Sequence, residues 1–365
     1  MKTRLLKCRR LVYSTMHRPP AENPGADARL AALAHWLESV LASPAAAIAP
    51  ASEDASFRRY FRVSLRAGAL VGAGRSATLI AMDAPPPRED CRPYVAVAEL
   101  LVAAGVHAPT VLAKDYEQGF LLLSDLGTRT YLDALTPASA PELYRDACAA
   151  LVRWQRASRE GLLPPYDRTL LRRELDLFPA WHVAKHLGVE LTGAQKAVLE
   201  DAFAAILANN LAQPCVFVHR DYHSRNLMVA EPNPGVLDFQ DAVFGPITYD
   251  LVSLLRDAYV EWDEERQIDW AARYWDSARR AGLPVRADFA DFWRDFEWMG
   301  VQRQIKVLGI FARLWHRDGK SGYLADMPRV MRYLRAACAR YRELAPLLRL
   351  LDALEDRRPV AGYSF

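Results

Sequence analysis

The chain has 365 residues, of which 51% are hydrophobic, and its 47 basic and 44 acidic side chains leave a formal net charge of +3. This length and apolar content allow a sizeable core, in one large domain or in two lobes. Because the charges are spread without blocks, the composition predicts a small-molecule substrate rather than a nucleic-acid partner. No apolar stretch approaches the roughly 20 residues that a membrane helix needs, so we expect no membrane partner.

Five cysteines are scattered along the chain and never form a C-x-x-C pair, which argues against a disulfide framework or a zinc site. This pattern predicts a cytoplasmic protein. The first ten residues are basic, but the apolar segment after them is too short for an export signal. We therefore expect a flexible tail or a mis-assigned start over residues 1–25, and a second tail over 351–365.

The first third of the chain predicts a small, sheet-rich unit that spans residues 26–123. Its expected elements are an amphipathic helix over 26–42, strands over 57–63 and 77–82 joined by a glycine-rich hairpin loop over 67–74, a helix over 92–104, and strands over 110–113 and 119–123. The run Ser124-Asp125-Leu126-Gly127 then interrupts the pattern. We expect these four residues to be a hinge between two lobes.

Beyond the hinge, helical periodicity dominates residues 128–350. The predicted helices cover 141–157, 170–187, 194–211, 249–259, 270–281, 288–314 and 327–344. The layout is therefore α+β, with a small sheet-containing N-lobe followed by a larger, mostly helical C-lobe.

The motif with the clearest chemistry is the run H-R-D-Y-H-S-R-N at residues 219–226, followed by Asp238. Phosphoryl transfer needs one carboxylate for the acceptor hydroxyl and oxygen ligands for Mg²⁺. The interval from Asp221 to Asn226 matches the kinase catalytic loop, in which the Asp is the base and the Asn reaches the metal. Asp221, Asn226 and Asp238 are thus the candidate catalytic and metal-binding residues.

The surroundings of this motif predict a strand before the loop, over residues 215–218, and a hairpin after it, over 227–237 with its turn at 231–235. Such a hairpin sets Asp238 beside Asn226. Any one of these residues alone could simply cap a turn, but the whole constellation favours catalysis. His223 and Arg225 either touch substrate or phosphate, or bond to nearby carbonyl groups.

With these motifs in place, residues 27–344 resemble the aminoglycoside phosphotransferase and choline kinase family, which are relatives of protein kinases. The resemblance implies a bilobal protein-kinase-like fold, ATP and Mg²⁺ as cofactors, Asp221 as base, and Asn226 and Asp238 as metal ligands. It also implies that the backbone of Ser124, Asp125 and Leu126 holds adenine, and that His219 and Asp250 brace the catalytic loop. Only residues 239–248 separate Asp238 from the next helix, too few for a protein kinase's activation segment.

The chain departs from the kinase pattern because it has no lysine between Lys7 and Lys114. The lysine that normally contacts the α- and β-phosphates is therefore missing from the strand ending at Asp83. Arg58, Arg59 and Arg62 are our candidates for the replacement cation. Glu99 either occupies the place of the lysine's partner carboxylate or is a surface charge.

A narrower set of segments resembles the anomeric sugar kinases of cell-wall recycling. They are residues 54–63, 81–86, 174–181, 219–226, 237–242 and 304–314. This closer resemblance implies transfer of phosphate from ATP to the C1 hydroxyl of N-acetylmuramate and N-acetylglucosamine. The candidate sugar contacts are Arg173, Glu174, Asp176, Trp181, His223 and Arg225. Trp181 fits a place in the helix core as well as it fits a sugar site, and the two carboxylates fit a solvated face equally well. Arg172, Arg173, Arg303 and Lys306 are available for the muramate carboxylate.

Three rival functions stay open at this point. An acidic cluster at residues 261–265 suits the cationic substrates of an aminoglycoside kinase, and the many aromatic residues suit choline or ethanolamine. From a different class, the missing lysine would suit a pseudokinase-like nucleotide-binding protein. The sequence leaves the oligomeric state undetermined, with a monomer favoured.

Overall fold

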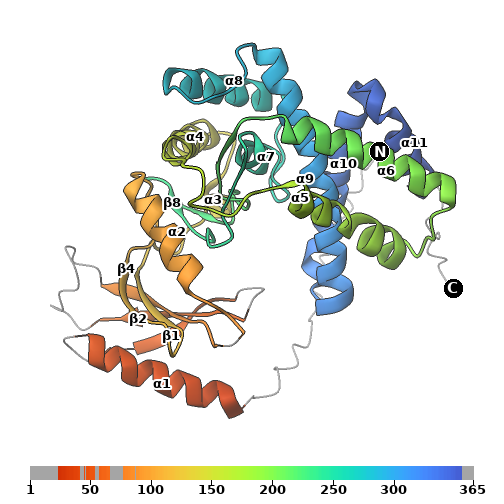
Figure 1. Ribbon diagram of the computed structural model, residues 1–365. Helices are drawn as coiled ribbons and strands as arrows, with labels where there is room; N and C mark the ends of the chain where they lie inside the picture. The colour runs from red at the N-terminus through yellow and green to blue at the C-terminus, as the bar shows by residue number, and fades with distance from the viewer. Residues whose placement is uncertain are drawn as a thin grey trace, which may run out of the picture.

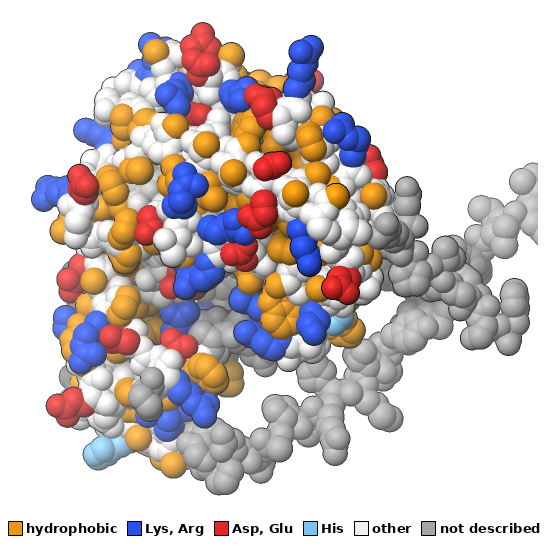
Figure 2. Space-filling model, turned by 45° about the vertical axis from the view of Figure 1, so that its right-hand side comes forward, with side chains coloured by type: hydrophobic (Ala, Val, Ile, Leu, Met, Phe, Trp, Pro, Cys, Tyr) orange, Lys and Arg blue, Asp and Glu red, His pale blue; other side chains and the backbone are white. Residues whose placement is uncertain are grey.

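A computed structural model describes residues 24–41, 45, 47–53, 57–65, 77–86 and 88–355. The predictions for residues 1–23, for the hairpin loop 67–74 and for the last ten residues lie outside this part of the chain. The described residues form two lobes, a smaller one that carries the large sheet and a larger helical one (Figure 1). On the face shown in Figure 2, positive and negative side chains are interspersed, as the balanced composition predicts.

The N-lobe contains a five-stranded antiparallel sheet with the order β1-β2-β3-β5-β4. Its strands are β1 (Ala47–Glu53), β2 (Arg59–Ser64), β3 (Thr78–Asp83), β4 (Val111–Asp115) and β5 (Phe120–Ser124). Helix α1 (Pro24–Val40) packs on one face of the sheet, and α2 (Arg92–Ala103) lies on the other side, toward the C-lobe (Figure 1). The predicted helices and four of the strands are confirmed, with shifts of a few residues at their ends.

Strand β1 was not predicted from the sequence. Its residues are mostly alanine with Pro50 in the middle, a composition that disfavours strands. Its place explains why it forms nevertheless, because β1 is an edge strand that pairs only with β2, where a proline can be tolerated.

The C-lobe is helical apart from two small two-stranded sheets. Its helices are α3 (Tyr131–Ala134), α4 (Ala140–Arg156), α5 (Arg168–Leu175), the π-helix η1 (Phe178–His186), α6 (Gly193–Leu211), α7 (Tyr249–Leu255), α8 (Glu264–Arg280), α9 (Phe289–Asp318), the 3₁₀ helix η2 (Ser321–Asp326), α10 (Met327–Arg340), the 3₁₀ helix η3 (Arg342–Leu344) and α11 (Ala345–Glu355). The strands are β6 (Cys215–Val218), paired with β9 (Val243–Pro246), and β7 (Leu227–Met228), paired with β8 (Gly235–Val236). No helix in the described ranges is long and apolar enough to cross a membrane.

Several predicted boundaries in this lobe were wrong, among them the start of α8 at Glu264 instead of 270 and the end of α10 at Arg340 instead of 344. The single helix expected over residues 170–187 is divided into α5 and η1, because Pro179 has no backbone N–H to continue an α-helix. Helix α7 ends at Leu255, well before the predicted residue 259. The tail expected from residue 351 is helical as far as Glu355, since α11 buries Leu347, Leu350, Leu351 and Leu354 in the core.

Helix α9 is 30 residues long and organises the C-lobe. It packs against α5, η1, α6, α7 and α10. Its approach to η1 is closest at Gly309, where an added Cβ would lie 2.5 Å from the backbone carbon of Leu177. This close contact requires a residue without a side chain, and it allows α9 to lie close to the start of η1.

We therefore expect Gly309→Ala to lower the free energy of unfolding by about 1–3 kcal/mol, because the backbone of Leu177 must move to admit a methyl group. Gly193→Ala is the control, since Gly193 is also helical, at the first position of α6, but has open space around its Cα. Urea unfolding of both variants measures the difference. Equal midpoints for the two variants would contradict the packing argument.

Candidate active site

The predicted hairpin exists and joins the two halves of the motif. Strands β7 and β8 pair Leu227 with Val236, so Asn226 and Asp238 lie at the same end of the hairpin. The Asn226 amide nitrogen donates to the Asp238 carboxylate at 3.2 Å and to the Asp221 carbonyl oxygen at 3.0 Å. Both bonds use the nitrogen, which leaves the Asn226 amide oxygen as a ligand.

The catalytic loop is braced from α7 and from the hairpin. The Asp250 carboxylate accepts hydrogen bonds from the backbone N–H groups of His219 at 2.7 Å and Arg220 at 2.9 Å. These bonds hold Arg220 at φ +78°, and Asp238 has φ +61°, a backbone region that non-glycine residues seldom adopt. The His219 ring lies 3.0 Å from the Leu237 carbonyl oxygen, so the residue connects the loop to the hairpin. Burial lowers the pKa of His219 to about 4 and keeps the ring neutral at pH 7.

Asp221 faces a region of positive charge. Burial raises the pKa of its carboxyl, but Lys306, His223, Arg220 and Arg303 together outweigh burial and lower the pKa to about 2. The carboxylate is therefore ionised at every pH at which the fold operates. An ionised carboxylate in this position can accept a hydrogen bond and then the proton of a substrate hydroxyl.

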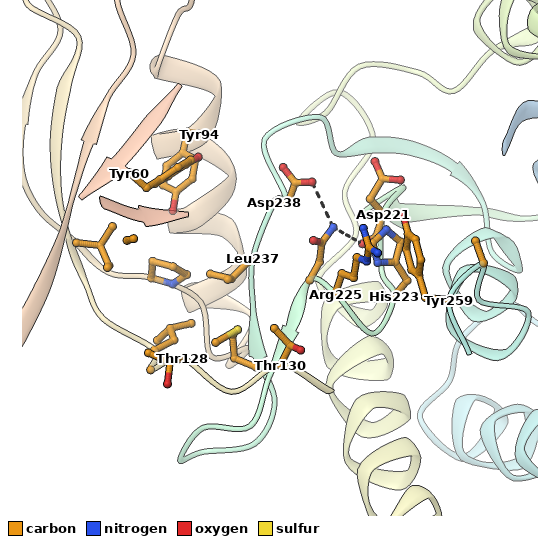
Figure 3. A pocket seen from close by; sticks show the side chains of 18 of the residues that line it. Tyr60, Tyr94, Thr128, Thr130, Asp221, His223, Arg225, Leu237, Asp238 and Tyr259 are labelled. Carbon is orange, nitrogen blue, oxygen red and sulfur yellow. Dashed lines mark hydrogen bonds between the residues drawn. The ribbon is translucent and has the colours of Figure 1, made fainter. Parts of the chain in front are cut away.

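Asp221 and Asp238 line a cavity of about 640 Å³ between the two lobes. Figure 3 shows Tyr60 and Tyr94 of the N-lobe on one side of Asp238, and His223, Arg225 and Tyr259 of the C-lobe on the other. Ser124, Asp125 and Leu126 of the predicted hinge line the first side, together with Ile80 and Leu123. The two ends thus offer an apolar slot beside the hinge and a polar, aromatic chamber beside Asp221.

The three arginines proposed for the phosphates have different surroundings. A nitrogen of Arg58 lies 4.0 Å from the carboxylate of Asp238, which lines the cavity, although Arg58 itself is not among the lining residues. Arg62 donates to Asp125 at 2.7 Å and lines the cavity beside the hinge. Arg59 instead pairs with the fully buried Asp83, its cross-strand neighbour, which also binds Arg29. Arg58 is therefore the best placed of the three, and Arg59 has a structural ion pair.

Glu99 is not in the site. Its carboxylate pairs with Lys114 at 3.7 Å, and both side chains are exposed. The surface interpretation of Glu99 is the correct one. Tyr94, from the same helix α2, lines the cavity instead.

Most of the residues predicted for the sugar lie elsewhere. Arg173 and Asp176 are exposed and Trp181 is half-buried, and the residues that line the cavity do not include them. Asp176 pairs with Arg172 one helical turn away, at 2.8 Å. Arg172 also binds Glu200, so it too is occupied. The helix-core and solvated-face alternatives describe these residues better, because the sequence pattern alone does not show which face of a helix meets a cavity.

Glu174 was expected to touch the sugar, but it is buried behind the site. Its carboxylate binds Arg220 at 2.6 Å and Lys306 at 3.1 Å, and it accepts a hydrogen bond from the Tyr166 hydroxyl. Burial raises the pKa of Glu174, but Lys306 and Arg220 outweigh it and keep the carboxyl below its usual range. Glu174 thus positions two of the cations that act on Asp221.

We expect Glu174→Ala to lower the free energy of unfolding by about 3–5 kcal/mol, because it leaves two buried cations without a counter-charge. The matched control is Asp176→Ala on an exposed turn, for which the loss is below about 1 kcal/mol. Thermal unfolding of both variants measures the difference. A Glu174 variant as stable as the control would show that the buried ion pairs contribute nothing.

The wall of the polar chamber was largely missed from the sequence. One face of α9 supplies six lining residues, and Tyr259 and Tyr323 complete the wall from the loop after α7 and from η2. The six are Arg303, Lys306, Val307, Ile310, Phe311 and Leu314. The sequence did contain a signal, since these positions recur at helical spacing and begin with two cations, but the same stripe also fits a buried core face.

Asp221, Asn226 and Asp238, held together beside a cavity between two lobes, are the arrangement expected of a protein-kinase-like phosphotransferase. Comparison with known proteins specifies the class further, since the model of the phosphotransferase enzyme family matches residues 47–290. The chain belongs to this family, and it is an enzyme that transfers phosphate. The sequence resemblance and the bilobal fold class are thereby confirmed.

Relatives of known function share most of the chain. It is 53% identical over 338 residues to an N-acetylmuramate/N-acetylglucosamine kinase of Pseudomonas aeruginosa, with 90% of this chain and 97% of the relative covered. A protein of Neisseria meningitidis with the same name is 47% identical over 338 residues, with coverages of 91% and 98%.

Solved structures agree at the level of the fold. An amicoumacin kinase in complex with AMP-PNP, Ca²⁺ and Ami has a TM-score of 0.58 at 13% identity, with 85% of this chain and 95% of that chain covered. ADP-bound aminoglycoside phosphotransferase APH(2'')-Ib has a TM-score of 0.54 at 14% identity, with coverages of 83% and 97%.

Proposed function

We propose that this enzyme transfers the γ-phosphoryl group of ATP to the anomeric C1 hydroxyl of N-acetylmuramate and N-acetylglucosamine. The relatives that are 47–53% identical over nine-tenths of the chain support these two acceptors. The observation that carries the proposal is the position of an ionised Asp221 between a hinge slot and a chamber walled by cations and aromatic rings. We also propose that the reaction takes place in the cytoplasm and returns cell-wall amino sugars to synthesis.

In this scheme the nucleotide occupies the side of the hinge and the sugar occupies the side of α9. Asp221 accepts the proton of the C1 hydroxyl while the hydroxyl oxygen forms a bond to the γ-phosphorus. The bond from that phosphorus to the oxygen that bridges it to the β-phosphorus breaks, and ADP leaves. A hemiacetal hydroxyl is more acidic than an ordinary alcohol, so a carboxylate with a low pKa is an adequate base. Positioning by the chamber supplies most of the catalysis.

Asn226 and Asp238 are the residues that would hold Mg²⁺. They fit it, because the Asp238 carboxylate and the Asn226 amide oxygen are hard oxygen ligands that lie side by side at the end of the hairpin. The described residues contain no group of three or more His, Cys, Asp or Glu side chains that could hold a metal, so the remaining ligands would be phosphate and water oxygens. When bound, the ion neutralises charge on the phosphates during transfer. Arg58 is our candidate for the cation that replaces the missing lysine.

The chamber does not favour the cationic acceptors of the rival functions. Its charged side chains beside Asp221 include Arg225, Arg303 and Lys306, which repel an aminoglycoside or choline. The acidic cluster at residues 261–265 lies outside the cavity, and Glu261 pairs with Arg332 while Glu264 pairs with Arg340.

The test is to incubate the purified protein with Mg²⁺-ATP and, separately, N-acetylmuramate, N-acetylglucosamine, kanamycin and choline. ADP release and phosphorus NMR of the product are measured for each acceptor. We expect turnover of the two amino sugars, with a phosphate coupled to the anomeric proton. A phosphate on another hydroxyl would refute the anomeric assignment, turnover only of kanamycin or choline would refute the acceptor class, and no turnover at all would favour a nucleotide-binding protein.

A further inference from the structure

Two arginines at the sugar end of the cavity have no acidic partner among the described residues. Arg303, on α9, is only 3% exposed, and its Nη1 atom has no hydrogen-bond partner. Arg225 is exposed and stacks on Tyr259, with its guanidinium carbon 3.7 Å from the ring centroid and 5.6 Å from that of Tyr323. Both arginines line the cavity.

The neighbouring cations are neutralised, which makes these two arginines exceptional. Lys306 binds Glu174, as does Arg220, and Arg62 binds Asp125. Burying a guanidinium without a counter-charge is costly, so a protein retains one where a ligand supplies the missing charge. Arg303 is near enough to Asp221 to help lower the pKa of that carboxyl, but its guanidinium makes no direct salt bridge among the described residues, which indicates that an anion can bind at this end of the cavity.

The two guanidinium groups approach the same place. Both line the same cavity as His223 and Tyr259, and Arg225 stacks on Tyr259. His223 and Tyr259 pack edge to face, with their centroids 5.4 Å apart. Figure 3 shows Arg225, His223 and Tyr259 together near Asp221, on the side of Asp238 away from Tyr60 and Tyr94.

The position of the two arginines distinguishes between the two anions that could bind, the nucleotide phosphates and a carboxylate of the acceptor. The nucleotide phosphates have their own partners at the centre of the cavity, where Asn226 and Asp238 could hold metal and Arg58 lies near. Arg225 and Arg303 instead belong to the chamber walled by Ile310, Phe311 and Tyr323, where the acceptor lies in our scheme. A planar guanidinium held against an aromatic ring matches a carboxylate with two parallel hydrogen bonds.

We infer that Arg303 and Arg225 form a carboxylate subsite that recognises the lactyl group of N-acetylmuramate. This inference rests on the proposed function and deepens it. N-acetylglucosamine lacks the lactyl group and leaves both cations without a partner. The subsite therefore makes the acidic sugar the preferred acceptor, and it assigns that preference to two side chains.

The test compares kcat/KM for N-acetylmuramate, for its lactyl amide, which has no charge, and for N-acetylglucosamine. Arg225→Gln is the main variant because the side chain is exposed and its loss does not endanger folding. Arg303→Lys is the second variant, because lysine keeps the charge but lacks the planar guanidinium that donates two parallel hydrogen bonds. The matched control is Arg279→Gln, since Arg279 is also exposed and stacks on an aromatic ring, Trp275 at 4.6 Å, outside the cavity.

We expect Arg225→Gln to lower the ratio of kcat/KM for N-acetylmuramate over N-acetylglucosamine by about 10–100-fold, mainly through KM for N-acetylmuramate. With the unmodified protein, kcat/KM for the lactyl amide should be lower than that for N-acetylmuramate by a similar factor. With the Arg225→Gln variant, kcat/KM for the amide should fall little further. Arg303→Lys should lower the ratio, and Arg279→Gln should leave it unchanged. An equal fall for both sugars in Arg225→Gln and Arg303→Lys would overturn the inference. If the unmodified protein turned over neither sugar, the proposed function would fail first, which is a distinguishable result.

Discussion

Replacing Asp221 by Asn should lower kcat by about 10³–10⁴-fold on either amino sugar, since the amide cannot accept the proton of the C1 hydroxyl. The substitution preserves the size of the side chain, so binding of ATP should change little. Steady-state rates and nucleotide titration of the same preparation measure the two quantities. Asp241→Asn is the matched control, because Asp241 is exposed in the segment just after Asp238 and does not line the cavity.

The low pKa of Asp221 adds a condition to this prediction. With a pKa of about 2, the base stays ionised throughout the accessible pH range, so its protonation cannot produce an acidic limb in the pH profile of kcat/KM above about pH 3. If the rate falls between pH 7 and 5, the residual activity of the Asn variant should therefore fall by the same factor. A limb that disappears with Asp221 would contradict both the pKa and the role of its cationic neighbours.

The second large effect is expected at Asp238. Asp238→Asn should lower kcat/KM by about 100-fold or more at fixed Mg²⁺ and raise the Mg²⁺ concentration for half-maximal rate, because one of the two protein ligands loses its charge. Asparagine tolerates the left-handed backbone region well, so the φ of +61° at this position is retained. The variant therefore isolates the charge of the ligand from the shape of the hairpin.

The check on Asp238 is a Mg²⁺ titration of the rate, with a thermal unfolding curve as the measure of integrity. An unchanged melting temperature together with a steeper Mg²⁺ requirement supports the assignment. An unchanged Mg²⁺ requirement would mean that the metal does not contact Asp238, and Arg58, 4.0 Å away, would become its main partner.

The grouping of Asp221, Asn226 and Asp238 could be predicted from the sequence because it depends on local structure. Asp221 and Asn226 lie in one loop, and a short turn of proline and asparagine brings Asp238 back to them, so neighbouring residues determine the geometry. The two lobes and the hinge followed from the change in periodicity near Ser124, again a local property.

The sugar chamber could not be predicted in the same way, because it depends on which face of a helix meets the cavity. Glu174 and Trp181 are polar and aromatic as a sugar site requires, yet Glu174 is buried among cations and Trp181 packs against the core. Tyr259 lines the cavity because α7 ends early, and residues 256–259, which contain no proline or glycine, gave no signal of that end. Which side chains line the cavity therefore depends on the packing of α9 against η1, two elements that are far apart in the sequence.

The division of the cavity between the lobes has a consequence for how such enzymes diversify. The slot beside the hinge is built from the N-lobe and the connector, whereas one face of α9 supplies most of the opposite wall. Substitutions at the cavity-lining positions of that face can change the accepted substrate while the loop of residues 219–226 and the slot beside the hinge stay as they are. A single helix can therefore act as an exchangeable module for acceptor choice, and variants of α9 would be a practical starting library for kinases of other acidic sugars.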